Sequence, residues 1–121
     1  MTMDAAQTKM LRLLGLGVRG RGAVVGVERV REAATRGTLV LAIVAPDASR
    51  HSLDKVVPLL AAKRVTMIEG PSAVELGRAV GRETTAAVGV TDPNLARGIR
   101  DALDAAALRW PGRNDGSSDG T

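Results

Sequence analysis

Glycine and arginine alternate in residues 19–22, which read Arg-Gly-Arg-Gly, and a helix signal begins shortly afterwards at Gly26. Arginine binds phosphate through several N–H donors at once, and glycine lets another backbone approach closely. The first amides of a helix also favour anions, because they have no partner inside the helix and lie at the positive end of its dipole. These residues predict a surface that binds phosphate, either of a nucleotide or of a nucleic acid.

Basic residues are concentrated around this segment. Between Lys9 and Arg36 the chain has seven Lys or Arg residues and two Glu residues, whereas the net charge of all 121 residues is only +4. A local positive field attracts polyanions, and each cation that contacts a phosphate makes binding more sensitive to salt. We expect RNA or another polyanion to contact this segment, through Arg19, Arg21, Gly22, Gly26, Arg29 and Arg31.

A nucleotide site is the second interpretation of this region. Residues 15–20 match the Gly-x-Gly-x-x-Gly pattern of dinucleotide-binding folds. That pattern lies between a buried strand and a helix, but Arg12 interrupts the apolar residues before it, and further glycines and valines follow it closely. The context therefore favours a nucleic acid over a nucleotide.

The sequence shows no residue pattern typical of a catalytic or metal site. Cysteine is absent and His51 is the only histidine, which excludes the usual zinc ligand sets and a cysteine nucleophile. The carboxylates are scattered at helix caps and surfaces, where Glu32, for example, can pair with Arg36 one turn later. We predict a protein that is not an enzyme and has no catalytic residue, metal or cofactor.

Composition limits the remaining classes. Trp110 is the only aromatic residue, so stacking of bases on aromatic side chains is excluded as the main binding mode. No apolar segment approaches the roughly 20 residues of a membrane span, and the first residues do not resemble a secretion signal. We expect a cytoplasmic protein without membrane contacts. Residues 1–7 and 110–121 contain little that could be buried and are expected to be disordered, which leaves one domain over residues 8–109.

Five helix signals alternate with strand signals inside this domain. The first helix covers residues 10–14 and is expected to end at Gly15 or Gly17. The second begins at Gly26 and ends at Gly37, because glycine accommodates the left-handed conformation that follows a helix.

Capping residues mark the later helices. Asp47 or Ser49 can cap the third helix, which Pro58 is expected to bend or shorten. Ser72 and Glu75 form a capping box for the fourth helix. The fourth helix is expected to stop at Gly81. Asp92-Pro93 then caps and opens a fifth helix, whose inward-facing residues extend to Ala106.

Strand signals are found at Val24–Val25, Leu39–Ala45, Val65–Ile68 and Ala86–Val90. The second is continuously apolar and fits a central strand that helices cover on both faces. Helices and strands that alternate in this way predict an α/β fold, a three-layer α/β/α sandwich with a small four-stranded sheet and about five helices.

Three segments occur in an order that a known family shares. They are Gly26 at the start of the second helix, residues 39–48 at the end of the central strand, and residues 75–81, which read Glu-Leu-Gly-Arg-Ala-Val-Gly. In this respect the chain resembles the kink-turn RNA-binding superfamily of ribosomal proteins, which includes the large-subunit proteins seven-A-e and thirty-e and short bacterial relatives. The resemblance covers nearly all of residues 9–109.

The resemblance implies a mixed four-stranded sheet, no enzymatic activity, and RNA contacts from two regions. The first region is the start of the second helix, Gly26–Arg31, and the second is the loop Gly81–Thr85. Family members carry Gly-Thr-Asn-Glu-x-x-Lys in the first region and an aliphatic-acid-aliphatic triplet in the second. Here Glu28 and Arg29 occupy the Asn and Glu positions, and Arg82-Glu83-Thr84 lacks the apolar residues. Because glutamate only accepts hydrogen bonds and arginine only donates them, the contacts to a kink-turn are expected to differ.

The sequence therefore predicts a non-enzymatic protein, monomeric when unbound, that binds structured RNA. Ribosomal RNA and the kink-turn are the candidate ligands. Two alternatives stay open, a small nucleotide-binding or transferase-associated module and a protein-interaction adaptor on the same fold. The complete set of expected RNA-binding residues is Arg19, Arg21, Gly22, Gly26, Val27, Glu28, Arg29, Arg31, Arg82, Glu83 and Thr84.

Overall fold

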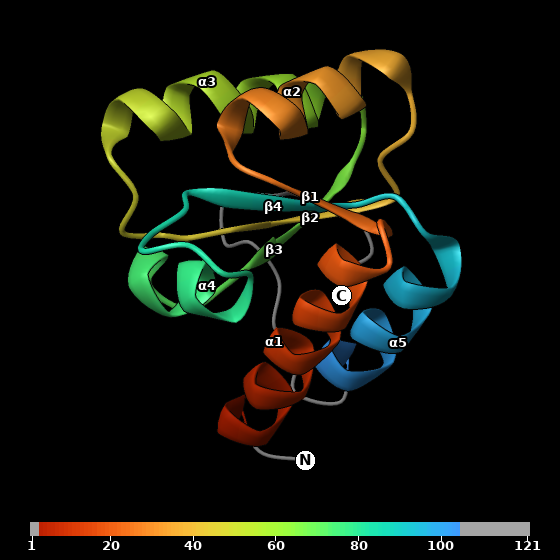
Figure 1. Ribbon diagram of the computed structural model, residues 1–121. Helices are drawn as coiled ribbons and strands as arrows, with labels where there is room; N and C mark the ends of the chain where they lie inside the picture. Colours follow the sequence, from red (N-terminus) through yellow and green to blue (C-terminus); the bar gives the residue numbers. More distant parts are fainter. Residues whose placement is uncertain (1–2, 105–121) are drawn as a thin grey trace, which may run out of the picture.

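A four-stranded sheet lies between two layers of helices in the computed structural model, which describes residues 3–104 (Figure 1). Helices α2 and α3 cover one face of the sheet, and α1, α4 and α5 cover the other. The predicted three-layer sandwich is thus confirmed. The elements are α1 (Met3–Arg19), β1 (Ala23–Val25), α2 (Val27–Arg36), β2 (Leu41–Val44), α3 (Arg50–Ala62), β3 (Thr66–Glu69), α4 (Ala73–Ala79), β4 (Ala87–Val90) and α5 (Pro93–Asp104).

The sheet is mixed, and its strand order decides which helix ends lie together. The order is β1-β4-β2-β3, with β2 parallel to β3 and β4 antiparallel to both of its neighbours. Consequently β1, β2 and β3 all end at the edge where β4 begins. The helices that follow those three strands, α2, α3 and α4, therefore all start at this edge.

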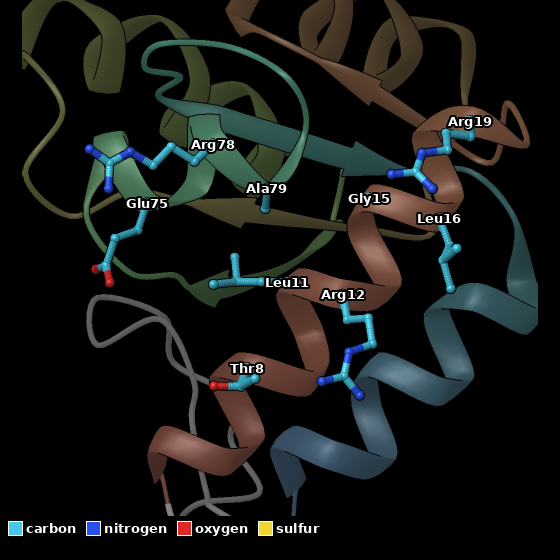
Figure 2. Close-up of a pocket in the computed structure, with 9 residues that line it drawn as sticks. All are labelled: Thr8, Leu11, Arg12, Gly15, Leu16, Arg19, Glu75, Arg78 and Ala79. Carbon is cyan, nitrogen blue, oxygen red and sulfur yellow. The ribbon is translucent and has the colours of Figure 1, made fainter.

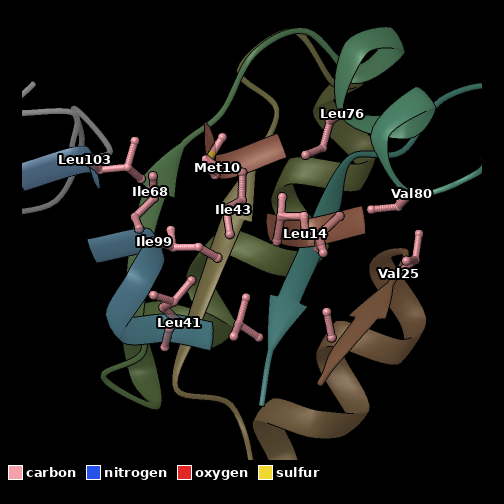
Figure 3. Packing of buried hydrophobic residues seen from close by; sticks show 14 of the residues in the cluster. Met10, Leu14, Val25, Leu41, Ile43, Ile68, Leu76, Val80, Ile99 and Leu103 are labelled. Atoms are coloured by element: carbon pink, nitrogen blue, oxygen red, sulfur yellow. The ribbon is translucent and has the colours of Figure 1, made fainter. Parts of the chain in front are cut away.

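The central strand β2 explains why the core has two halves. All four of its residues are buried, and successive side chains point to opposite faces of the sheet. Leu41 and Ile43 pack with side chains of α1 and α5, as Figure 3 shows, whereas Ala42 and Val44 pack below α2 and α3. The core is aliphatic, as the composition requires. On the α1 side its largest fully buried residues include Met10, Leu14, Ile68, Leu76, Ile99 and Leu103.

The first helix is longer at both ends than the sequence predicts. It begins at Met3, so residues 3–7, expected to lie outside the domain, are helical and Ala6 is completely buried. It also continues through Gly15 and Gly17 to Arg19. A Cβ atom on Gly15 would lie 2.8 Å from the Ala79 carbonyl oxygen, and one on Gly17 would collide with Leu95. These glycines allow close packing against α4 and α5, and they do not end the helix.

The third helix also differs from its prediction. Ser49 caps it by accepting a hydrogen bond from the Ser52 amide at 3.1 Å. Asp47 instead accepts from the amide of Ala73, at 2.8 Å, in the first turn of α4. Pro58 lies inside α3 and does not shorten it. Proline removes one helical hydrogen bond, and Pro58 is on the exposed side of the helix, where water can take the place of the missing N–H donor.

The remaining boundaries follow the predicted signals. Ser72 accepts from the Glu75 amide at 3.2 Å, and Gly37 ends α2 in the left-handed conformation. Asp92 accepts from the Asn94 amide at the start of α5. Ala106 and residues 110–121 lie outside the described residues. No helix within residues 3–104 is long and apolar enough to cross a membrane.

Candidate functional site

The predicted site residues lie at opposite edges of the sheet (Figure 1). Arg19, Arg21 and Gly22 precede β1, whereas Gly26 and the start of α2 follow it. The three residues of β1 keep the two groups about 10 Å apart. We call residues 19–22 with Thr91 and Asp92 the Arg19 edge, and residues 26–29 with residues 81–85 the Gly26 edge. The residues expected to form a single phosphate-binding surface over residues 19–31 are therefore divided between two separate parts of the molecule.

Residues at the Arg19 edge form a closed turn. The Gly22 amide donates to the Gly17 carbonyl at 2.7 Å and the Arg21 amide to that of Val18 at 3.2 Å, which is the hydrogen-bonding pattern of a Schellman helix end. Arg21 occupies the left-handed position at φ 63°. The Gly22 carbonyl in turn accepts from the Thr91 amide at 2.9 Å. The Gly22 amide and carbonyl are thus both used within the chain, and not for the close approach of a ligand backbone that the sequence suggests.

The charges at the Arg19 edge also have a structural explanation. Arg19 lies in the last turn of α1, where a cation interacts favourably with the negative end of the helix dipole. The one helix that starts here, α5, already has Asp92 as its cap. Its first amides are therefore partly satisfied, and an added phosphate would meet the Asp92 carboxylate.

The local structure does not match the dinucleotide motif. Residues 15–19 belong to α1, so the glycine pattern lies in a helix and its final turn, and a strand follows it where the motif requires a helix. His51 is exposed in the first turn of α3. Within the described residues there is no group of three His, Asp or Glu side chains that could hold a metal ion.

At the Gly26 edge, the chain passes from β1 into α2 at a single glycine. Gly26 has φ 100° and ψ 156°, a conformation that is essentially restricted to glycine. No side chain of the described residues caps α2, although Ser49 and Ser72 cap the two other helices that begin at this edge. The first amides of α2, those of Val27, Glu28 and Arg29, are thus the uncapped helix donors here.

The loop between α4 and β4 lies directly beside this helix start. The Gly26 amide donates to the Ala87 carbonyl at 3.0 Å, which joins the end of β1 to the residue that follows the loop. Thr85 is 7% exposed, and its amide donates to the Ala73 carbonyl at 3.0 Å while its hydroxyl donates to the Ala87 carbonyl at 3.1 Å. The two regions that the family resemblance singles out are therefore neighbours.

Gly77 determines how closely the loop lies on α4. A Cβ atom on Gly77 would lie 2.6 Å from the Cα atom of Thr84, so no other residue fits without moving the backbone. The Arg82 amide donates to the Gly77 carbonyl at 2.8 Å and fixes the start of the loop. With the loop held in this way, the side chains of Arg82, Glu83 and Thr84 all point into solvent and are exposed.

Three charged side chains lie near the start of α2. Two of them, Glu28 and Arg31, contact α3, and Arg29 does not. Glu28 pairs with Lys55 at 3.4 Å, and the Arg31 guanidinium donates to the Lys55 carbonyl at 2.6 Å. Arg29 and Arg82 are exposed and make no side-chain hydrogen bond or ion pair with any described residue. Arg31 is consequently a link between helices, and Arg29 and Arg82 are the cations available to a ligand.

Lys55 is a neighbour of the candidate site that the sequence does not reveal. It is 27 residues from Glu28 along the chain, and only the parallel packing of α2 and α3 brings the two together. Their ion pair is exposed, so it stabilises the fold by less than about 1 kcal/mol.

Comparison with known proteins gives this arrangement a family. The family model described as "Ribosomal protein L7Ae/L30e/S12e/Gadd45 family" matches residues 8–100, which include both regions of the Gly26 edge. The chain belongs to this family. The resemblance noted in the sequence is thereby confirmed, and so is the mixed sheet that it implied.

Two solved structures of similar fold extend the comparison. A protein of unknown function from Bacillus halodurans is 30% identical, with a TM-score of 0.71, over 79% of this chain and 97% of that one. The Giardia lamblia 15.5kD RNA binding protein is 19% identical, with a TM-score of 0.68, over 85% of this chain and 88% of that one. At 19% identity the likeness concerns the fold alone. A search of curated proteins finds no match.

Proposed function

We propose that this member of the family is a non-enzymatic RNA-binding protein and that it contacts structured RNA through the Gly26 edge. Family membership supports RNA as the ligand, and the Giardia lamblia protein of the same fold is named as an RNA binding protein. The observation that carries the proposal is the hydrogen bond from Gly26 to Ala87. It holds the uncapped start of α2 next to the loop that presents Arg82.

In this proposal the backbone and two arginines bind phosphate. The amides of Val27, Glu28 and Arg29 point out of the helix start, where the dipole favours an anion. The guanidinium groups of Arg29 and Arg82 supply charge from the two neighbouring regions. Such contacts recognise the position of phosphates and so the shape of the RNA, and they carry little sequence information.

Hydrogen bonds to bases are the part of the proposal in which this chain differs from its relatives. Glu28 can accept from a base amino group but cannot donate, and it stands where the family has an asparagine. Glu83 and Thr84 supply further acceptors beside Arg82. We expect preference for a bent RNA such as a kink-turn, in ribosomal RNA or another structured RNA, because a bend brings two phosphate backbones to two adjacent donor regions.

Paired arginine substitutions test this function. The R29A/R82A variant should bind a kink-turn RNA at least about tenfold more weakly, and its affinity should vary less with salt, by about two in the log-log slope, because two phosphate contacts are lost. The matched R19A/R21A variant removes the same charge from the Arg19 edge and should retain nearly the wild-type slope. The measurement is a filter-binding titration at several salt concentrations, with one protein bound per RNA.

A straight duplex of the same length serves as the second RNA. Weaker binding of the duplex than of the kink-turn RNA is the expected result. If neither RNA binds at low salt, or if both arginine pairs cost the same affinity, RNA binding by the Gly26 edge is refuted.

A further inference from the structure

A groove runs between α1 and α4, on the face of the molecule opposite to α2 and α3 (Figure 2). Its volume is about 560 Å³. The two helices touch where Gly15 faces Ala79, since a Cβ on Gly15 would lie 2.8 Å from the Ala79 carbonyl oxygen, and the groove follows this line of contact. The α1 residues that line it recur at positions 8, 11, 12, 15, 16 and 19, which form one face of the helix.

The floor of the groove is apolar. Leu11 lines it from the side of α1 nearer α4, and Ala79 lines it from α4, whereas Leu16 lines it from the side of α1 that faces away from α4 (Figure 2). Leu16 is 55% exposed, which makes it the most exposed large hydrophobic side chain of the described residues. A single exposed leucine is ordinary on a protein surface, but Leu16 adjoins the concave site that Leu11 and Ala79 form, and so extends the apolar surface that a ligand can cover.

The rim of the groove is positively charged. Arg12, Arg19 and Arg78 line it together with a single carboxylate, that of Glu75. None of the three arginines makes a side-chain hydrogen bond or ion pair with a described residue, and all three are exposed. Arg12 and Arg19 are seven residues apart, so they lie two helical turns from each other, a rise of about 10.5 Å.

The apolar residues and the arginines of the groove together favour one kind of ligand over others. A second copy of the chain that presents the same face would bring like charges together. RNA would gain from the arginines but not from the leucines, and Arg19 is at the end of α1 where the dipole disfavours phosphate. An amphipathic helix with acidic residues beside its apolar face satisfies both features, because its apolar side chains cover the floor and its carboxylates pair with the rim.

We propose that the groove between α1 and α4 binds an acidic amphipathic helix of a protein partner. Apolar side chains of that helix contact Leu11 and Leu16, and Asp or Glu residues seven apart pair with Arg12 and Arg19. The proposal goes beyond RNA binding and does not depend on it, because the Gly26 edge and the groove use different residues.

A designed peptide tests the proposal with the full chain. The probe is a fluorescein-labelled helical peptide of about five turns with leucines on one face and glutamates seven residues apart beside them. Fluorescence anisotropy should show saturable binding to the wild type. The R12E/R19E variant and the single variant L16E should each bind at least about tenfold more weakly, which is the cost of losing about 1.4 kcal/mol.

Three controls make the result specific. The variant R50E/K63E carries the same charge reversal at the first residue of α3 and at the residue that follows this helix, in the opposite layer, and should bind the peptide as the wild type does. A peptide with lysines in place of the glutamates should bind R12E/R19E better than the wild type. Melting temperatures from circular dichroism establish that each variant is folded.

Several outcomes overturn the proposal. These are no binding of the acidic peptide to the wild type, equal binding to R12E/R19E, and no gain for the lysine peptide on that variant. A loss of kink-turn RNA affinity in R12E/R19E as large as the loss of peptide affinity would assign the groove to RNA instead. Failure of RNA binding by the wild type, with the peptide result intact, would refute the proposed function alone.

Discussion

Glycine and arginine occur together at both ends of β1, but the two ends differ in what the backbone leaves open. At the Arg19 edge the amides of Arg21 and Gly22 complete a helix end, and Asp92 caps the helix that begins there. At the Gly26 edge the same residue types adjoin a helix start that no described side chain caps. Two segments of similar composition thus differ in their backbone, because only the Gly26 edge has uncapped helix donors beside exposed cations among these two.

The two edges also differ in how they are held. Gly77 and Thr85 fix the loop of the Gly26 edge against α4 by close backbone contact, while the loop side chains remain exposed. At the Arg19 edge, the backbone groups of Arg21 and Gly22 form hydrogen bonds within the chain. One edge is thus a rigid support for exposed side chains, and the other is a connection between α1 and β1.

The largest expected effect is that of Gly77→Val, which breaks the support of the Gly26 edge. The added side chain would displace the backbone at Thr84, so we expect a loss of about 3 kcal/mol in the free energy of unfolding, as for other overpacked sites. Kink-turn RNA affinity should fall as well. Urea unfolding and RNA titration measure the two effects.

Gly98→Ala is the control for this substitution. Gly98 lies inside α5, and a Cβ there makes only ordinary contact with Leu13 at 3.5 Å. Alanine should stabilise the protein by up to about 1 kcal/mol, since it favours a helix over glycine. If Gly77→Val were as mild as this control, the loop would not rest on α4 as described.

Gly26→Ala comes next and tests the turn into α2. Alanine has to adopt φ near 100°, which costs about 2 kcal/mol, although open space surrounds the position. The expected result is a lower melting temperature together with weaker RNA binding, because relief of the strain reorients the first amides of α2. Unchanged stability would show that the glycine conformation is not required.

A smaller effect is expected for Asp92→Ala, which makes the Arg19 edge more like the Gly26 edge. Loss of the cap at the Asn94 amide should cost about 1 kcal/mol. RNA affinity should remain at the wild-type value, because this edge lacks the second loop. Thermal unfolding and filter binding check the two statements, and an RNA affinity raised to several times that of the wild type would contradict the distinction between the edges.

Local signals in the sequence predict most of the fold. The continuous apolar segment around Leu41, the cap at Ser72 and the stop at Gly37 each act within a few residues, so their effect is visible along the chain. The length of α1 was mispredicted because Gly15 and Gly17 act through packing against α4 and α5, which are distant in sequence.

The candidate site is only partly visible in the sequence for the same reason. Gly26 and Arg29 were predicted from the helix signal that begins at Gly26. Arg82 was predicted from the family resemblance, which points to the loop Gly81–Thr85. The pairing of Lys55 with Glu28 and the separation of Arg19 from Gly26 depend on strand order and helix packing. Neither the ion pair nor the separation can be predicted from the spacing of residues along one segment.

The most direct test of the Gly26 edge is an amide-detected NMR titration of the labelled protein with a kink-turn RNA. The chemical shifts of the amides of Val27, Glu28 and Arg29 and of residues 82–84 should change most, in proportion to saturation, while those of residues 19–22 change little. Changes centred on residues 19–22, with the start of α2 unaffected, would contradict RNA binding at the Gly26 edge.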